Sequence, residues 1–192
     1  MRNAMIKMLL LSLSLFFLFG CAGTSNYMVK AEKPVEISKE KASVYFMRPS
    51  GMGFAINFQI WDGDKFVGLS QAKSYFRYVC DPGKHLFIAI AENKTFVPAE
   101  LEAGKRYYVV TGPRMGWIKA RIGLTPVKKD SEEMGKVKDW EGDLEYIAPI
   151  DENVKTWESL HKEEARALVQ YFDALSQEKK AEYIVLSPDD GI

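Results

Sequence analysis

The two side chains best suited to nucleophilic chemistry, Cys80 and His85, flank the turn sequence Asp81-Pro-Gly-Lys84. A four-residue hairpin turn would place them on facing strand positions, with Cβ atoms about 5 Å apart. An imidazole beside a thiol favours the reactive thiolate. A hairpin tip, however, supplies neither an oxyanion hole nor a cleft that excludes water. We therefore expect a buried thiol and a turn-exposed imidazole, and predict no catalytic residue in the chain.

Other motifs that would indicate enzymatic or cofactor chemistry are absent from the sequence. The chain has two histidines and lacks the H-E-x-x-H, C-x-x-C and G-x-S-x-G patterns. No glycine-rich loop joins a strand to a helix, and the spacing of carboxylates indicates no metal ligands. We predict a protein that is not an enzyme, with no cofactor-binding residues and no metal site.

A different kind of chemistry is predicted at Cys21. The apolar run 8–19 follows Arg2 and Lys7 and ends in Leu18-Phe-Gly-Cys21, a pattern typical of a signal peptide. The run is shorter than the roughly 18 residues that cross a bilayer as a helix. Leu18-Phe-Gly-Cys21 resembles the lipobox of bacterial lipoproteins, whose cysteine is lipidated and becomes the mature N-terminus. The alternatives are an uncleaved membrane anchor and a plain secretory signal.

The lipoprotein resemblance implies a signal peptide over residues 1–20, lipid attachment at Cys21 and anchoring to the membrane by several acyl chains. Ala22 after the cysteine implies sorting to the outer membrane, with the protein facing the periplasm. Residues 21–42 are polar and are expected to form a tether. Without residues 1–20 the chain has 24 basic and 26 acidic side chains, a balance that gives no electrostatic reason to bind nucleic acid.

The elements that must position any site are short strands separated by turn residues. Alternation and turn signals predict seven or eight strands within residues 43–48, 54–61, 66–69, 74–80, 84–92, 95–101, 106–111 and 117–127. In 54–61 the apolar residues Phe54, Ile56, Phe58 and Ile60 share one face. Asp62-Gly63 predicts one hairpin turn and Pro82-Gly83 a second, while Pro98 indicates an edge strand or a bulge.

This pattern predicts a mainly β domain over residues 43–127. The expected fold is a seven- to eight-stranded antiparallel β-sandwich, immunoglobulin-like or transthyretin-like in outline, with a small barrel as the alternative. The opening Val44-Tyr-Phe-Met-Arg-Pro-Ser50 resembles that of the DUF2846 family of bacterial envelope proteins. The similarity continues through Ile60–Gly68, Pro82-Gly-Lys-His85 and Glu102–Tyr108. It implies a fold and carries no catalytic residues.

The remaining residues predict a connection and a helical extension. Residues 128–152 are charged and irregular, and a C-terminal α-helical extension is expected over 153–192, with Asp151 or Asn153 as the cap. An apolar stripe recurs at helical spacing, formed by Val154, Trp157, Leu160, Leu168, Tyr171, Phe172 and Leu175. A second helical segment is expected over 177–183. We expect the stripe to pack on the sandwich; a helix that binds a partner is the alternative.

Aromatic side chains provide the last candidates for binding. Most are expected in the core, whereas Trp61 alternates against the apolar face of its strand and is a candidate for ligand contact, together with Tyr75 or Arg77. The leading hypothesis is a membrane-anchored envelope lipoprotein that binds or assembles with other envelope components, an envelope protein being the expected partner. A glycan- or small-ligand-binding lipoprotein is the alternative, and an exposed aromatic cluster or a concave pocket would favour it.

Overall fold

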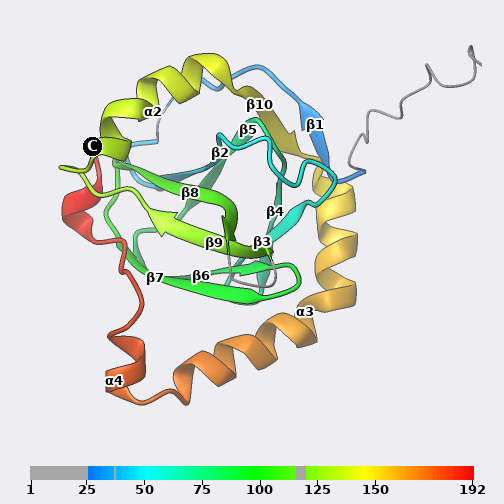
Figure 1. Ribbon diagram of the computed structural model, residues 1–192, viewed down its shortest axis with the longest axis vertical. Coiled ribbons are helices and arrows are strands. Elements are labelled where there is room, and N and C mark those ends of the chain that lie inside the picture. Colours follow the sequence, from blue (N-terminus) through cyan, green and yellow to red (C-terminus); the bar gives the residue numbers. More distant parts are fainter. Residues whose placement is uncertain (1–25, 37, 116–119) are drawn as a thin grey trace, which may run out of the picture.

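The computed structural model describes residues 26–36, 38–115 and 120–192, which form two β-sheets flanked by helices (Figure 1). The strands are β1 Met28–Lys30, β2 Ala42–Arg48, β3 Phe58–Asp62, β4 Lys65–Ser70, β5 Ser74–Cys80, β6 Gly83–Ile90, β7 Lys94–Leu101, β8 Arg106–Met115, β9 Ala120–Pro126 and β10 Glu145–Pro149. The helices are α2 Glu132–Asp143, α3 Asp151–Asp173 and α4 Gln177–Lys180, followed by the 3-10 turn η2 Pro188–Asp190.

The predicted mainly β sandwich is confirmed. One sheet has the order β1-β10-β5-β2-β8-β9 and the other the order β4-β3-β6-β7. Two neighbouring pairs, β2 with β8 and β10 with β5, are parallel, so the sheets are not antiparallel throughout as expected. Parallel neighbours require long crossover connections, which local turn signals do not reveal. β7 ends its sheet, as Pro98 indicated, and there Leu186 forms an isolated parallel bridge with Ala99.

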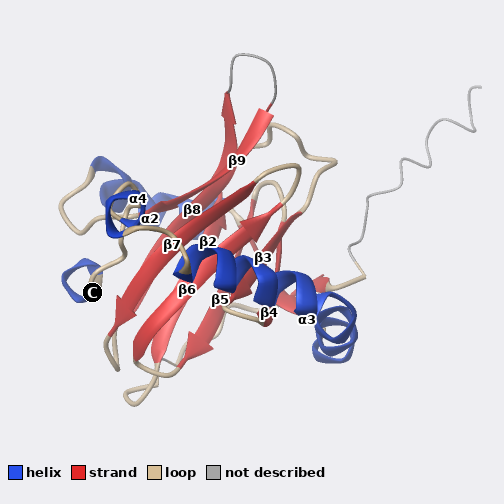
Figure 2. Cartoon of the chain, turned by 90° about the horizontal axis from the view of Figure 1, so that it is seen from below, coloured by secondary structure: helices blue, strands red, loops and turns tan. Residues whose placement is uncertain are grey.

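Helices cover the outer faces of both sheets, so the molecule has four layers (Figures 1 and 2). The main core lies between the sheets and extends under α3 through Trp157, Leu168 and Phe172. A second cluster, which includes Tyr45 and Met47 of β2, lies between the larger sheet and α2. Every residue of β2 is therefore buried, since a strand covered on both faces has no exposed side.

The two predicted hairpin turns have different outcomes. Asp62 and Lys65 pair directly across Gly63, whose φ of 59° is readily adopted only without a side chain, so this hairpin is confirmed. The turn before Gly83 instead carries the chain from β5 in the larger sheet to β6 in the smaller one. The expected hairpin between Cys80 and His85 is therefore wrong.

The strand predicted over 54–61 begins only at Phe58. Residues 54–57 belong to a loop, and Phe54 and Ile56 are exposed rather than on the buried face. A bulge between Ile60 and Trp61 places both of these side chains in the core. The alternating pattern thus continued past the true strand end.

The segments expected to be a tether and an irregular connection contribute to the fold. Within 21–42, β1 pairs with β10 and buries Met28, so the polar tether cannot extend to residue 42. Within 128–152, the structure contains α2 and β10 instead of an irregular surface segment. Ser131 caps α2 by accepting a hydrogen bond from the Met134 amide.

The C-terminal helical extension is confirmed, with changes of detail. Ile150, which provides no side-chain hydrogen bond, occupies the N-cap position of α3 in place of Asp151 or Asn153. The apolar stripe packs on the sandwich through Trp157, Leu168 and Phe172, whereas Leu160 and Tyr171 remain exposed. The second helical segment is the short α4, which ends at Lys180.

Candidate functional site

The predicted lipid-attachment residue, Cys21, lies outside the described residues. None of the described helices has the length and apolar composition needed to cross a membrane. The candidate sites within the described part of the chain lie at the two ends of the sandwich and on its α3 side.

A polar cluster occupies the end of the sandwich where β3 and β5 finish and β6 begins. The Asp62 carboxylate accepts hydrogen bonds from the Tyr78 hydroxyl, at 2.9 Å, and from Nδ1 of His85, at 2.7 Å. The other ring nitrogen of His85 donates to the Asp81 carbonyl oxygen at 2.9 Å. The side chains of Asp62 and His85 are only 11% and 12% exposed, so this is a largely buried ion pair.

The geometry keeps the His85 imidazole protonated. The hydrogen bond to Asp62 raises the pKa of His85 most, and the neighbouring Cys80 side chain adds to this, so that the pKa reaches about 10. Burial, followed by the charge of Asp62, raises the pKa of the Tyr78 hydroxyl well above its usual value. The structure thus brings Cys80 and His85 close, although by a sheet crossing rather than a hairpin.

This cluster does not have the arrangement of a nucleophile and a base. A general base needs a free lone pair within reach of the nucleophile's proton. Both nitrogens of His85 donate, one to a carboxylate and one to a backbone carbonyl. The Cys80 side chain is buried. The hydrogen bonds of the polar cluster join the ends of β3 and β5 to the start of β6.

The aromatic ligand site suggested by the sequence is not formed. Trp61 is fully buried beneath α3, where its indole nitrogen donates to Gln59 at 3.2 Å, and Trp157 of α3 donates to the same Gln59 oxygen. Tyr75 is also buried, but in the cluster beneath α2 on the opposite outer face. Trp61 therefore lies on the other side of the sandwich from Tyr75, and Arg77 extends from β5 to bond the Glu36 carbonyl.

The opposite end of the sandwich carries the loop of residues 49–57, which we call the 49–57 loop. Arg48 at the end of β2 is fully buried and holds this loop from below. Its guanidinium donates to the carbonyl oxygens of Met52, Gly53 and Ile56 at 2.7–3.0 Å, and to that of Ser70 on β4 at 3.2 Å.

The Arg48 charge is stabilised without a carboxylate. All its described acceptors are backbone carbonyls, and its Nε has no hydrogen-bond partner among the described residues. The guanidinium lies 4.0 Å from the centre of the Phe58 ring, a favourable cation–π distance. Burial lowers the pKa of Arg48 below its usual value. Peptide dipoles and an aromatic face thus replace a counterion and fix the backbone of the loop.

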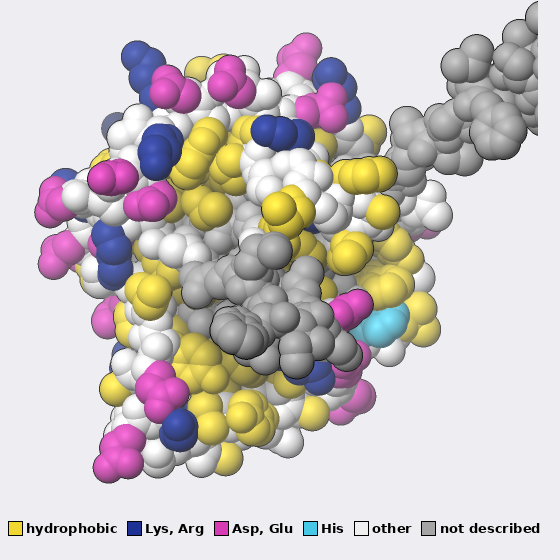
Figure 3. All heavy atoms as spheres, in the orientation of Figure 1, with side chains coloured by type: hydrophobic (Ala, Val, Ile, Leu, Met, Phe, Trp, Pro, Cys, Tyr) yellow, Lys and Arg dark blue, Asp and Glu magenta, His cyan; other side chains and the backbone are white. Residues whose placement is uncertain are grey.

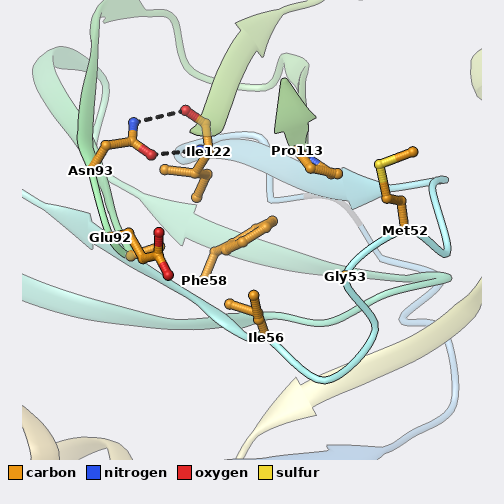
Figure 4. A pocket seen from close by; sticks show the side chains of 9 residues that line it. Met52, Gly53, Ile56, Phe58, Glu92, Asn93, Pro113 and Ile122 are labelled. Atoms are coloured by element: carbon orange, nitrogen blue, oxygen red, sulfur yellow. Dashed lines mark hydrogen bonds between the residues drawn. The ribbon is translucent and has the colours of Figure 1, made fainter. Parts of the chain in front are cut away.

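An apolar pocket of about 80 Å³ opens beside this loop (Figure 4). Its apolar lining is formed by Met52, Ile56, Phe58, Ala91, Pro113 and Ile122. Figure 4 shows side chains from the loop and from both sheets converging on this space, with Glu92 at its edge. Asn93 bonds both backbone groups of Ile122 and so joins the two sheets there. Figure 3 views the molecule from this end, where hydrophobic side chains form several exposed groups.

A larger groove, of about 460 Å³, lies between α3, β7 and the segment after α4. Its walls include the aromatic rings of Phe96, Tyr171 and Tyr183, with the Lys94–Glu164 ion pair at 3.5 Å alongside. Tyr171 is 57% exposed. The volume of the groove falls within the range of small-molecule sites, whereas the 80 Å³ pocket admits only part of a ligand.

Sequence reasoning missed the part that Arg48 plays. Its position at the end of an apolar strand, before Pro49, reads as an exposed strand terminus. The groove was also missed, because Phe96 and Tyr183 are 87 residues apart and only the packing of α3 brings them together. Within the described ranges, no three His, Cys, Asp or Glu side chains gather as a metal site would require. Comparison with protein-family models, with curated proteins and with solved structures found no match to this chain.

Proposed function

We propose that this protein is a lipid-anchored envelope lipoprotein whose β domain binds or assembles with other envelope components and catalyses no reaction. Lipid on Cys21 holds the protein to the membrane. Ala22 after the cysteine favours the outer membrane, with the domain facing the periplasm. An envelope protein is an expected partner, and nucleic acid is not. The resemblance of residues 43–127 to the DUF2846 family belongs to the same proposal, since that family also consists of envelope proteins.

One observation carries the binding role: a rigid loop that presents apolar side chains to solvent. Phe54 is 80% exposed, and the backbone on both sides of it is hydrogen-bonded to the buried Arg48. Exposed apolar groups on a flexible loop are uninformative, but a loop held in place from below is preorganised for contact. The polar cluster at the other end supports a role other than catalysis, because both nitrogens of His85 are engaged.

The anchor is tested by the substitution Cys21→Ser in the full chain. We expect the variant to accumulate as unprocessed precursor or to be released from the membrane fraction. The mass of the N-terminal peptide of the wild-type protein should show a processed, acylated cysteine. Normal processing and membrane retention of the variant would refute the lipoprotein proposal.

Binding is tested by placing a photocrosslinking amino acid at position 54 and irradiating intact envelopes. Position 160 on α3 is the matched control, since Leu160 is 72% exposed but lies on a helix. We expect adducts with envelope components from position 54 in excess of those from 160. Equal yields at the two positions would contradict binding through the 49–57 loop.

A glycan- or small-ligand-binding lipoprotein is the second candidate, and the groove between α3 and β7 favours it. Sugars bind by stacking their apolar faces on aromatic rings and by hydrogen bonds to nearby charged groups, which here are Lys94 and Glu164. Titration of the protein with chitooligosaccharides, followed by NMR, tests this candidate. Saturable shifts that Tyr171→Ala abolishes and Leu160→Ala preserves would support it; no shifts up to millimolar concentrations would contradict it.

A further inference from the structure

The 49–57 loop exposes three large apolar side chains at alternate positions. Met52, Phe54 and Ile56 are 55%, 80% and 45% exposed. Scattered single apolar residues are ordinary on protein surfaces, whereas several on one short loop indicate a contact site. Polar alternatives in the loop are few, since the intervening residues are Gly53 and Ala55.

The loop cannot bury these side chains by folding back. Arg48 bonds the carbonyl oxygens of Met52, Gly53 and Ile56, and the Ile56 amide donates to Gly53 across the tip at 2.9 Å. Only Met52 and Ile56 line the pocket beneath, and the Phe54 side chain is left in solvent. The exposure is therefore a property of the folded state, maintained by hydrogen bonds from the buried Arg48.

The loop lies on the same edge of the sandwich as the start of the described chain. The Met28 sulfur of β1 accepts a hydrogen bond from the Leu69 amide of β4, and the next carbonyl along, that of Ser70, accepts one from Arg48. A second connection runs through β10. The Glu145 amide of β10 donates to the carbonyl oxygen of Lys73, and the Lys73 side chain packs near Gly51. β1 and the 49–57 loop are thus joined through β4 and β10.

Chain length limits how far this edge can be from the anchor. Cys21 precedes Asn26 by five residues, which allows at most about 18 Å between their Cα atoms. Because β1 belongs to the sheet, the link is not the long tether that the sequence suggested. A lipid on Cys21 would hold this edge of the domain beside the bilayer surface.

We propose that the 49–57 loop is a bilayer-contacting element, in which Met52, Phe54 and Ile56 enter the boundary between lipid headgroups and acyl chains. This inference rests on the proposed lipid anchor. A protruding tip fits a fluid bilayer, whereas a stable protein interface needs about 800 Å² of complementary surface on each partner. Among the described side chains, the exposed charges of Lys73 and Glu92 near the loop are of opposite sign. The contact is therefore apolar and insensitive to salt.

The test uses the full-length lipoprotein reconstituted in phosphatidylethanolamine–phosphatidylglycerol vesicles. A nitroxide is attached to Phe54→Cys and, as the matched control, to Leu160→Cys. Cys80 is buried and free, so the wild-type chain treated with the same reagent sets the background. Collisions of each nitroxide with oxygen, which concentrates in lipid, are compared with collisions with a water-soluble nickel chelate.

We expect the label at position 54 to collide at least threefold more often with oxygen relative to nickel than the label at 160, equally in 50 mM and 500 mM salt. Equal ratios at the two positions would overturn the bilayer contact. The bilayer contact would also be overturned if the high ratio of oxygen to nickel collisions at position 54 disappeared in high salt. The contact would then be electrostatic. Protein adducts without lipid adducts, when a photocrosslinker at 54 is irradiated in envelopes, would assign the loop to a protein partner instead.

The failure of this inference can be told apart from the failure of the anchor. The mass of the N-terminal peptide, measured on the same preparations, reports acylation of Cys21 independently of the nitroxide. An acylated protein with a water-exposed label at 54 retains the anchor and loses the bilayer contact. An unmodified Cys21 refutes the anchor, and with it the reason for placing the loop at the bilayer.

Discussion

The two ends of the sandwich each bury a charge, but they stabilise it in different ways. Asp62 is paired with a protonated His85 and a tyrosine hydroxyl, so the buried negative charge at the polar end is balanced by a positive one. Among the described residues, Arg48 at the other end is paired with backbone carbonyls, three from the 49–57 loop and that of Ser70 on β4, and with an aromatic ring. Asp62, Tyr78 and His85 are residue types common in active sites, but here their hydrogen bonds join parts of the fold. The end that holds the buried Arg48 exposes the apolar loop through which we propose binding.

The comparison is tested most strongly at Arg48. Replacement by methionine removes four hydrogen bonds, one of them fully buried and three partly buried, which should cost about 3 kcal/mol of unfolding free energy. The urea midpoint measures this loss. Arg166→Met, at an exposed arginine on α3, should leave the midpoint nearly unchanged. If the two variants are equally stable, Arg48 does not hold the loop as described.

The polar end should respond somewhat less to the loss of its carboxylate. Asp62→Ala leaves the His85 ring and the Tyr78 hydroxyl without their acceptor, and we expect a loss of about 2 kcal/mol in urea unfolding. Asp81→Ala is the control, because the ion pair of that exposed carboxylate within the described residues is with Lys41 at the surface. A larger effect at Asp81 than at Asp62 would contradict the buried pair.

The pH dependence of stability gives a further test, which is specific to His85. Its pKa rises from 6.5 in the unfolded chain to about 10 in the fold, so protonated His85 stabilises the fold fully below pH 6.5. This contribution is lost as the pH rises towards 10. The difference in unfolding free energy between wild type and His85→Gln should therefore shrink over that interval. Parallel profiles would show that the imidazole is not held as a cation.

The smallest effect on stability is expected at Phe54. Because this ring is 80% exposed, Phe54→Ser should change the unfolding free energy by less than about 0.5 kcal/mol. Phe58→Ala, beneath the Arg48 guanidinium, should by contrast destabilise the protein strongly. A marked loss of stability in Phe54→Ser would mean that the ring packs within the fold and is not available for contact.

Much of the β structure could be predicted from alternation and turn residues. The strands around 43–48, 74–80 and 95–101 lie within a residue or so of their expected bounds, and Asp62-Gly63 does form a hairpin. The missed elements had weaker signals. The sequence signal for α2 consists of Ser131 and the acidic residues after it. The signal for β10 is a short alternation that ends at Pro149. α2 is stabilised chiefly by packing on the larger sheet, whereas β10 is stabilised by pairing with β5 and β1 within that sheet.

The candidate sites were harder to predict. Phe54 and Ile56 fit the period of a buried strand, yet they lie in a loop, because the same pattern is satisfied whether or not a partner strand is present. Trp61 was expected on an exposed face, but α3 covers that face. Sequence alone could not show that an outer face would be covered, since the helix follows 90 residues later.

The sequence by itself determined the mainly β composition, the amphipathic helix at the C-terminus and the prediction of lipid at Cys21, because these depend on local periodicity and on short motifs. Only the tertiary structure decided that Asp62 would meet His85, that Arg48 would hold the 49–57 loop and that β1 would shorten the tether. Those outcomes depend on the order of strands in two sheets. Alternation specifies which side chains share a face, but not which partner covers it.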